Sequence, residues 1–133
     1  MKKQLQRSAL FLFLTTLSVS NQTIQAQTFS AGAEHALFAC SGNVPMVTGR
    51  NNLGQLGNGT NNNSSLAIPV SSLNGIIAVA GGEKFSMFLK NNGTVWACGE
   101  NVDGQLADGT TTNQTTPVQS GTITGVMAIA GGG

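Results

Sequence analysis

The sequence predicts an all-β protein built from repeated small sheets, and three observations support this. Only 8% of the 133 residues are charged, 18 residues are glycine, and short apolar runs recur at a constant spacing of 50 residues. Long helices and coiled coils need many more Ala, Glu, Lys and Arg residues, so the composition excludes them. Two cysteines are too few for a disulfide scaffold. Many glycines with few charges are typical of short strands joined by turns.

The first 26 residues have the three-part pattern of a secretory signal peptide. Lys2, Lys3 and Arg7 precede an apolar run at 8–19, and a polar stretch then leads to Ala26. A membrane-spanning helix needs about 20 apolar residues, which is more than this run contains. We therefore predict a signal-peptide helix at 1–26 that packs on nothing and is removed on export. Cleavage after Ser20 and a buried N-terminal helix are the alternatives.

Cleavage after Ala26 changes the charge of the chain from +1 to −2, because three of the six basic residues and none of the acids leave with the signal peptide. Binding to phosphates requires clustered Lys and Arg side chains, which the remaining chain lacks. Nucleic acid is therefore not an expected partner. We expect the mature protein to be secreted, periplasmic or held at the cell surface.

The mature chain repeats itself every 50 residues. Gly49–Thr60 recurs as Gly99–Thr110, with Gly, Asn, Gly, Gln, Leu, Gly and Thr at the same places, and Ala78–Gly82 recurs as Ala128–Gly132. A run of matches in one register marks a repeat architecture. The sequence divides into a first repeat at 27–75, a second at 76–125 and the first strand of a third at 126–133.

Each repeat contains several short strands. In the second repeat we expect them at 76–80, 85–89 and 94–98. The Asn92-Gly93 step between the last two indicates a hairpin with a type I′ turn, in which both central residues take a positive φ. The first repeat has Gly42-Asn43 there. A weaker fourth strand is expected around 68–71, and Pro69 requires that strand to lie at a sheet edge.

These strands are apolar on both faces, since Met87 and Phe88 point to opposite sides of one strand. A small sheet covered on both faces and repeated along the chain is typical of a β-propeller. We predict about two blades of four antiparallel strands each, an incomplete propeller. Trp96 is expected to pack between blades. We also expect 27–133 to be a fragment that is marginally stable, aggregates, or assembles with copies of itself.

The string Gly-x-Asn-x-x-Gly-Gln-Leu-(Gly/Ala)-x-Gly-Thr, followed by Pro-Val and a strand ending Ala-Gly-Gly, resembles the regulator-of-chromosome-condensation repeat. Lys90–Gly99 is similar to the hairpin of that family, and the resemblance covers 28–133. It implies a β-propeller that serves as an interaction platform. The family's inner hairpin usually carries a His-Ser pair, with the His packing and hydrogen bonding between blades. Here the pair is His35-Ala36 in the first repeat and Phe85-Ser86 in the second.

The residues that could carry chemistry do not form a catalytic pattern. His35 has no nucleophile and acid placed beside it by the sequence, so we predict a structural role. Cys40 lies five residues along the strand and therefore points to the opposite face, which disfavours a Cys–His dyad. Whether Cys40 and Cys98 are free or paired stays open, since export permits disulfides.

The acidic loop 101–112 is a weak match to a calcium site. Asn101, Asp103 and Asp108 are present, but Thr112 stands where a bidentate Glu is required. We predict that these side chains stabilise turns, as do the recurring Gln55 and Gln105. We expect no catalytic residue, metal or cofactor.

Two polar runs, at 61–65 and 110–116, are predicted to be loops. Loops on a rigid scaffold often carry binding specificity, although a plain connector is the alternative. The favoured function is an exported propeller scaffold, not an enzyme, that binds a protein or a cell-surface polymer. The alternatives are an accessory domain of a secreted enzyme whose catalytic domain lies beyond Gly133, and an enzyme-inhibitor propeller.

Overall fold

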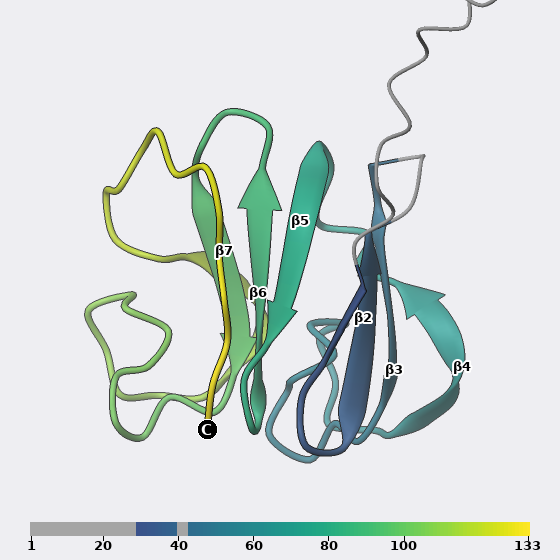
Figure 1. The fold of residues 1–133 in the computed structure, drawn as a ribbon. Coiled ribbons are helices and arrows are strands. Elements are labelled where there is room, and N and C mark those ends of the chain that lie inside the picture. The colour runs from purple at the N-terminus through teal and green to yellow at the C-terminus, as the bar shows by residue number, and fades with distance from the viewer. Residues whose placement is uncertain (1–28, 40–42) are drawn as a thin grey trace, which may run out of the picture.

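The computed structural model describes residues 29–39 and 43–133 (Figure 1). Within these residues the regular structure consists of strands alone. The predicted signal-peptide helix at 1–26 lies outside the described residues. The described chain forms two sheets that stand side by side.

Each sheet has four antiparallel strands in the order in which they occur along the chain. Blade 1 contains β1 (Phe29–Ala31), β2 (His35–Ala39), β3 (Pro45–Gly49) and β4 (Ser64–Pro69). Blade 2 contains β5 (Ile76–Gly81), β6 (Phe85–Lys90), β7 (Val95–Gly99) and β8 (Gln114–Gln119). The predicted all-β class and the predicted sheets of four antiparallel strands are therefore confirmed.

The outermost strands differ from the prediction. β4 starts at Ser64, earlier than the strand expected around 68–71, and β8 starts at Gln114, inside the predicted loop 110–116. β8 is polar, and β4 begins with two serines before its short apolar run at Leu66–Ile68, so no apolar pattern marks where either strand starts. They form because β3 and β7 each present a free row of backbone N–H and C=O groups, which pair with any extended segment. Pro69 lies at the sheet edge, as predicted.

The hairpin between β6 and β7 forms where it was predicted, but its turn type was wrong. Among its turn residues only Gly93 has a positive φ, of 79°. The Gly93 N–H donates to the Lys90 carbonyl at 2.9 Å, and the Lys90 N–H donates to the Thr94 carbonyl at 2.9 Å. The turn is therefore type I followed by a left-handed glycine, a common longer hairpin connection.

The core lies between the blades. One buried cluster takes its members from blade 1, from the connection to blade 2 and from blade 2 itself, and it comprises Leu37, Ala39, Val47, Leu56, Val70, Leu73, Ile76, Val79, Phe88 and Cys98. Phe88 is its largest fully buried side chain. Each sheet thus buries one face by packing against the other.

Trp96 packs against this cluster but is only half-buried. Its indole N–H donates to the Thr94 hydroxyl at 3.3 Å, and the Lys90 ammonium lies 5.4 Å from the ring centroid. The predicted packing between the blades is therefore confirmed, with the ring only partly buried. An indole has a polar N–H that needs a hydrogen-bond acceptor and a ring face that attracts cations. A position between the core and solvent lets the ring meet Thr94 and Lys90 while its apolar part packs on the core.

The inner strands approach so closely that only glycine fits at their ends. A Cβ on Gly81 would stand 2.6 Å from the Gly32 nitrogen and 2.7 Å from the Ala31 carbonyl carbon, and both atoms belong to backbone. We expect Gly81→Ala to lower the free energy of unfolding by about 1–3 kcal/mol, because the two inner strands must separate. Gly132→Ala is the control, since a Cβ there meets nothing within 4 Å. Urea unfolding of the two variants would test the packing; equal midpoints would contradict it.

Residues 126–133, predicted to open a third repeat, belong to neither sheet. They nevertheless lie against blade 2 much as β5 lies against blade 1. A Cβ on Gly131 would collide with the Gly81 carbonyl oxygen. The Val126 N–H donates to the Gly93 carbonyl at 3.1 Å, as the Ile76 N–H does to the Asn43 carbonyl. The repeat therefore continues in position, although no hydrogen-bonded ladder forms.

Candidate functional site

The long loop after β3 is organised by one buried amide. Asn51 is fully buried, and its side-chain oxygen accepts from the Leu56 N–H at 2.8 Å. Its side-chain nitrogen donates to the carbonyls of Thr60 and Asn62 at 2.8 and 3.0 Å. The Asn51 side chain thereby ties the start of the loop to residues 56, 60 and 62 further along it.

The loop after β7 repeats this arrangement. Asn101 accepts from the Leu106 N–H at 2.9 Å and donates to the carbonyls of Thr110 and Thr112 at 3.1 Å each. Its amide also donates to Asp108, which holds that carboxylate inside the loop. The pKa of Asp108 is lowered, and the main cause is the hydrogen bond that its carboxylate accepts from the Thr110 N–H. Of the side chains considered for calcium, Asn101 and Asp108 are thus occupied in turn stabilisation, whereas Asp103 contributes only its backbone N–H.

The recurring glutamines also brace their own loops. The side-chain oxygen of Gln55 accepts from the Leu53 N–H at 2.9 Å, and that of Gln105 accepts from the Asp103 N–H at 3.0 Å. The structural role predicted for this pair agrees with these contacts. The polar run at 61–65 is likewise partly structural, because Asn63 accepts from the Asn51 N–H at 2.8 Å.

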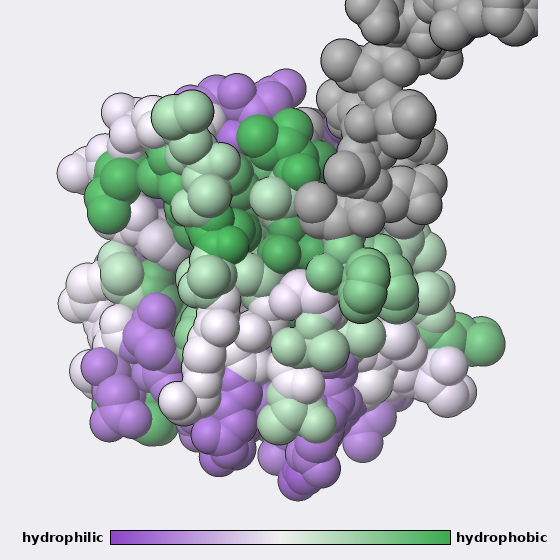
Figure 2. Space-filling view, in the orientation of Figure 1, coloured by the Kyte–Doolittle hydropathy of each residue, from purple (hydrophilic) through white to green (hydrophobic). Residues whose placement is uncertain are grey.

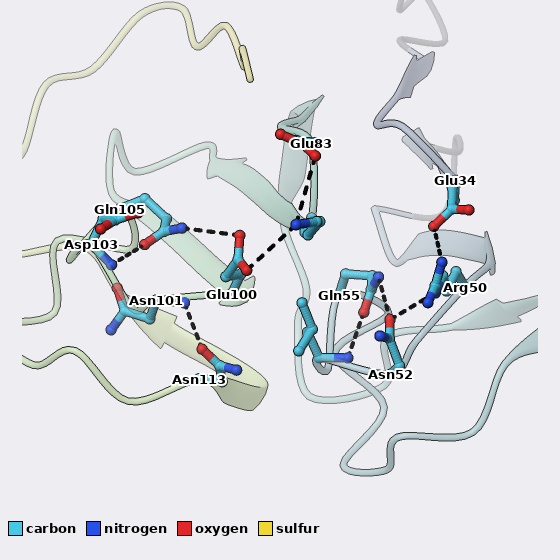
Figure 3. Close-up of polar contacts among 12 residues, drawn as sticks. Glu34, Arg50, Asn52, Gln55, Glu83, Glu100, Asn101, Asp103, Gln105 and Asn113 are labelled. Carbon is cyan, nitrogen blue, oxygen red and sulfur yellow. Dashed lines mark hydrogen bonds and ion pairs between the residues drawn. The ribbon is translucent and has the colours of Figure 1, made fainter.

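One end of the molecule gathers most of the charge. Figure 2 shows hydrophilic side chains along the lower end, where the β1–β2 and β5–β6 turns meet the loops that follow β3 and β7. Figure 3 shows how these side chains face one another there. Six of the eight charged residues in the described part of the chain contribute to this charged end. Five are labelled in Figure 3, and the sixth, Lys84, lies 3.7 and 3.8 Å from two of them; the six are Glu34, Arg50, Glu83, Lys84, Glu100 and Asp103.

The two blades carry the same ion pair with its signs reversed. In blade 1 Arg50 pairs with Glu34, and both side chains are about half exposed. In blade 2 the residues 50 positions later are Glu100 and Lys84, whose charged atoms lie 3.8 Å apart. Lys84 also lies 3.7 Å from Glu83. Exposed pairs of this kind add little stability, so their main effect is to present a patterned charge to solvent.

A glycine-lined hollow of about 320 Å³ opens near the charged end. Three segments line it, residues 31–33, 81–83 and 131–133, and Glu83 is its one charged member. The three segments are successive copies of the end of the inner strand. Six of the nine lining residues are glycines, so few side chains fill the space between the three segments.

His35 links the two blades in the interior. Its Nε2 atom lies 3.0 Å from the Ser86 hydroxyl of blade 2, and that hydroxyl donates to the Gln55 carbonyl of blade 1 at 2.6 Å. Because the Ser86 proton is used on Gln55, His35 must donate to Ser86. The pair bridges the blades and is not aligned for proton abstraction from the serine.

The sequence alone did not place Ser86 beside His35. The signal was present, however: the family's His-Ser pair is divided between the two repeats, and the structure joins the His of one blade to the Ser of the next. Cys98 is free and fully buried, 3.6 Å from the Gln55 carbonyl, and burial raises the pKa of its thiol. Cys40 lies outside the described residues, so its predicted relation to His35 stays a prediction.

Burial lowers the pKa of His35, and the nearby Phe85 backbone opposes this shift only in part. The His35 side chain therefore binds a second ring proton more readily in the unfolded chain than in the folded protein. We expect the free energy of unfolding to fall as the pH drops from about 7.5 through about 6.5, the pKa of an unfolded histidine. His35→Phe, which copies Phe85 of the second repeat, should remove this dependence. Urea midpoints between pH about 7.5 and about 5 measure it, and an unchanged slope in the variant would contradict it.

Comparison with known proteins agrees with this architecture. The family model for the regulator of chromosome condensation (RCC1) repeat matches residues 47–89 and 92–133, and a second model of that repeat matches 76–105. The chain therefore belongs to the RCC1-repeat family, whose members build β-propellers. No curated protein matches the chain.

Three solved structures resemble it. Human WBSCR16 is 28% identical, with a TM-score of 0.60 over 68% of this chain. Prp20p from Saccharomyces cerevisiae, described with its binding to Gsp1p and histones, is 17% identical, with a TM-score of 0.64 over 70%. Yeast RCC1 (Prp20) with bound Kap60 is 18% identical, with a TM-score of 0.61 over 78%. The matches cover 24%, 25% and 27% of those chains, so this chain spans about a quarter of their length.

In the described part of the chain, no helix is long and apolar enough to span a membrane.

Proposed function

We propose that this chain is part of an exported propeller scaffold that binds a partner protein through its charged end. The observation that carries the proposal is the concentration of six charged side chains at one end of two rigid blades. Each of them is fixed to a β-turn or to a loop held by Asn51 or Asn101. A surface presented in this way is preorganised, so little conformational entropy is lost when a partner binds.

Three further points support the proposal. The yeast propellers that resemble this chain are described with bound or binding proteins. The pattern of residues 1–26 favours export. The charged end has four acidic and two basic groups, so a basic protein surface fits it better than a polyanion.

The test uses the chain as bait against the extracellular and envelope proteins of its host. We expect a bound protein to be lost when Glu83, Lys84, Glu100 and Asp103 are changed together to Gln, Gln, Gln and Asn. Lys90→Gln, at the other end of the blade, is the matched control and should retain it. Both proteins should unfold at the same urea concentration as the original. Equal capture by the two variants would overturn the assignment of the charged end.

Export has its own measurement. Mass spectrometry of the protein outside the cell should find an N-terminus at Gln27. Protein that begins at Met1 in that fraction would overturn the proposed export without affecting the binding surface.

A further inference from the structure

The contact between the blades defines two kinds of face. The forward face is the side of blade 1 that packs on blade 2, and the backward face is the side of blade 2 that packs on blade 1. Because the repeats are related by an offset of 50 residues, blade 2 has a forward face equivalent to that of blade 1. Likewise, blade 1 has a backward face equivalent to that of blade 2. Within the described residues, no other blade covers either of these outer faces.

The backward face of blade 1 has the side chains of a contact surface. Phe88 is fully buried on the backward face of blade 2, next to Val79, which is 6% exposed. At the same places in blade 1, Phe38 is 36% exposed and Phe29 is 77% exposed. The same apolar positions are thus buried in one blade and left in solvent in the other, which marks the exposed set as an unpaired interface.

The forward face of blade 2 shows the same contrast. Gly54, Gln55 and Gly57 of blade 1 are buried where they meet blade 2. Their counterparts Gly104, Gln105 and Ala107 are half-buried or exposed. The exposed loop nevertheless has the folded shape of the buried one, because Asn101 makes the same contacts as Asn51. This face is therefore formed in advance of any contact.

The two outer faces also complement each other at one specific position. Inside the chain, His35 on the forward face donates to Ser86 on the backward face. On the outer faces Phe85 stands in place of the His, and Ala36 stands in place of the Ser. A change of only one partner would leave a buried polar group without a hydrogen bond, whereas both have become apolar. A large ring on one face thus matches a small methyl group on the other.

The segment 126–131 supplies the remaining part of such a contact. Its sequence copies β5, with Ile129 at the place of Val79, and Gly131 sits against Gly81 as Gly81 sits against Gly32. β5 has six residues, but β1 has only three. Residues 126–131 can therefore displace the short β1, and Phe29 with it, from beside β2 of another blade 1. Ile129 then takes the place of the exposed Phe29 opposite Phe38.

We propose that the forward face of blade 2 docks on the backward face of blade 1 in a second copy of this chain, head to tail, with 126–131 as the inner strand of the docked blade. Two observations favour a second copy as the occupant. The backward face of its blade 1 carries Ala36, the small apolar partner that Phe85 requires. The contact also repeats the interface between blade 1 and blade 2 within one chain. Contacts of this type are heterologous and build rings or longer assemblies. The proposal does not depend on the charged end.

Sedimentation at several concentrations tests the pairing of the faces. We expect the chain to associate as its concentration rises. Phe85→His and Ala36→Ser should each weaken association roughly tenfold or more, since each leaves a buried polar group unpaired. The double variant should recover most of the loss, because it recreates the pair of His35 and Ser86. A chain that stays monomeric, or single variants whose effects simply add, would overturn the proposal.

Cysteine cross-linking tests the direction of docking. A Cβ on Gly57 would stand 2.9 Å from the Cys98 sulfur, and the same contact between copies joins Ala107 to Thr48. In a Cys40→Ser background, a mixture of Ala107→Cys and Thr48→Cys chains should give a disulfide-linked dimer. Each variant alone should not, nor should Ala107→Cys mixed with Asn74→Cys, whose thiol lies on an exposed loop.

The other occupants give different results. Dimers of Ala107→Cys alone would indicate that two forward faces meet, which contradicts the proposal. A monomeric Ala107→Cys chain whose introduced thiol reacts freely with a small reagent would leave the face to a further repeat or to another protein, and this also contradicts it. Ala128→Pro, which removes a backbone N–H from the inner strand, should abolish association and leave the urea midpoint of the blades unchanged.

Discussion

Replacing Asn51 by Ala is expected to lower the free energy of unfolding by about 3–5 kcal/mol, among the largest effects of any single substitution in this chain. The side chain is fully buried and serves the Leu56 N–H and the carbonyls of Thr60 and Asn62 at once. Its loss leaves these backbone groups without partners in the interior. It also frees the loop whose Gly54 and Gly57 pack on blade 2.

A second substitution separates hydrogen bonding from side-chain size. Asn51→Asp keeps the acceptor for Leu56 but places an oxygen against the two carbonyls, so we expect it to be as damaging as Asn51→Ala. Asn61→Ala is the control, because Asn61 is exposed and donates only to the Asn52 carbonyl. Urea unfolding followed by circular dichroism measures all three. A loss below about 1 kcal/mol for Asn51→Ala would show that solvent replaces its hydrogen bonds.

The sequence predicted the strands whose residues enter the core. The runs at 76–80 and 85–89 are apolar and end at glycine or at a polar turn, and both form close to the expected places. The offset of 50 residues then extended this result to blade 1. Burial governs these strands, and burial can be read from the order of apolar residues.

The sequence did not predict what depends on backbone pairing or on distant partners. β8 is polar, and it becomes a strand because β7 offers an edge. The turn at Gly93 takes one positive φ where two were expected, and an Asn-Gly step is compatible with both geometries. The sequence predicted that Trp96 packs between the blades, but not that Lys90 and Thr94 contact the part of the ring that stays near solvent.

The candidate site shows the same division. The charges of the charged end are visible in the sequence, but their meeting at one end follows from the antiparallel order of the strands. That order brings Glu34 to Arg50 and Lys84 to Glu100. The offset of 50 residues shows that an acid in one pair corresponds to a base in the other, but only the structure shows that the members of each pair are in contact. The link from His35 to Ser86 crosses 51 residues, and only the packing of the two blades reveals it.

A matched pair of phenylalanines is expected to measure how much the contact between blades contributes to stability. Phe88 and Phe38 occupy the same place in successive repeats, but Phe88 is fully buried between the blades and Phe38 is 36% exposed. We expect Phe88→Ala to cost about 3–5 kcal/mol, because it leaves a cavity at the centre of the shared core. In a dilute solution Phe38→Ala should cost less than half as much, since part of its ring already lies in water.

The difference between the two losses mainly reports the neighbouring blade, because both residues occupy the same position in the second strand of their sheet and each has two apolar cross-strand partners. Phe38 pairs with Phe29 and Met46, and Phe88 pairs with Val79 and Trp96. Chemical denaturation of both variants at one low concentration gives the comparison. Equal losses would mean that the blades are stabilised within each sheet and not by their contact. A loss at Phe38 that grows with protein concentration would in turn place this side chain in an interface between chains, since only association can bury it further.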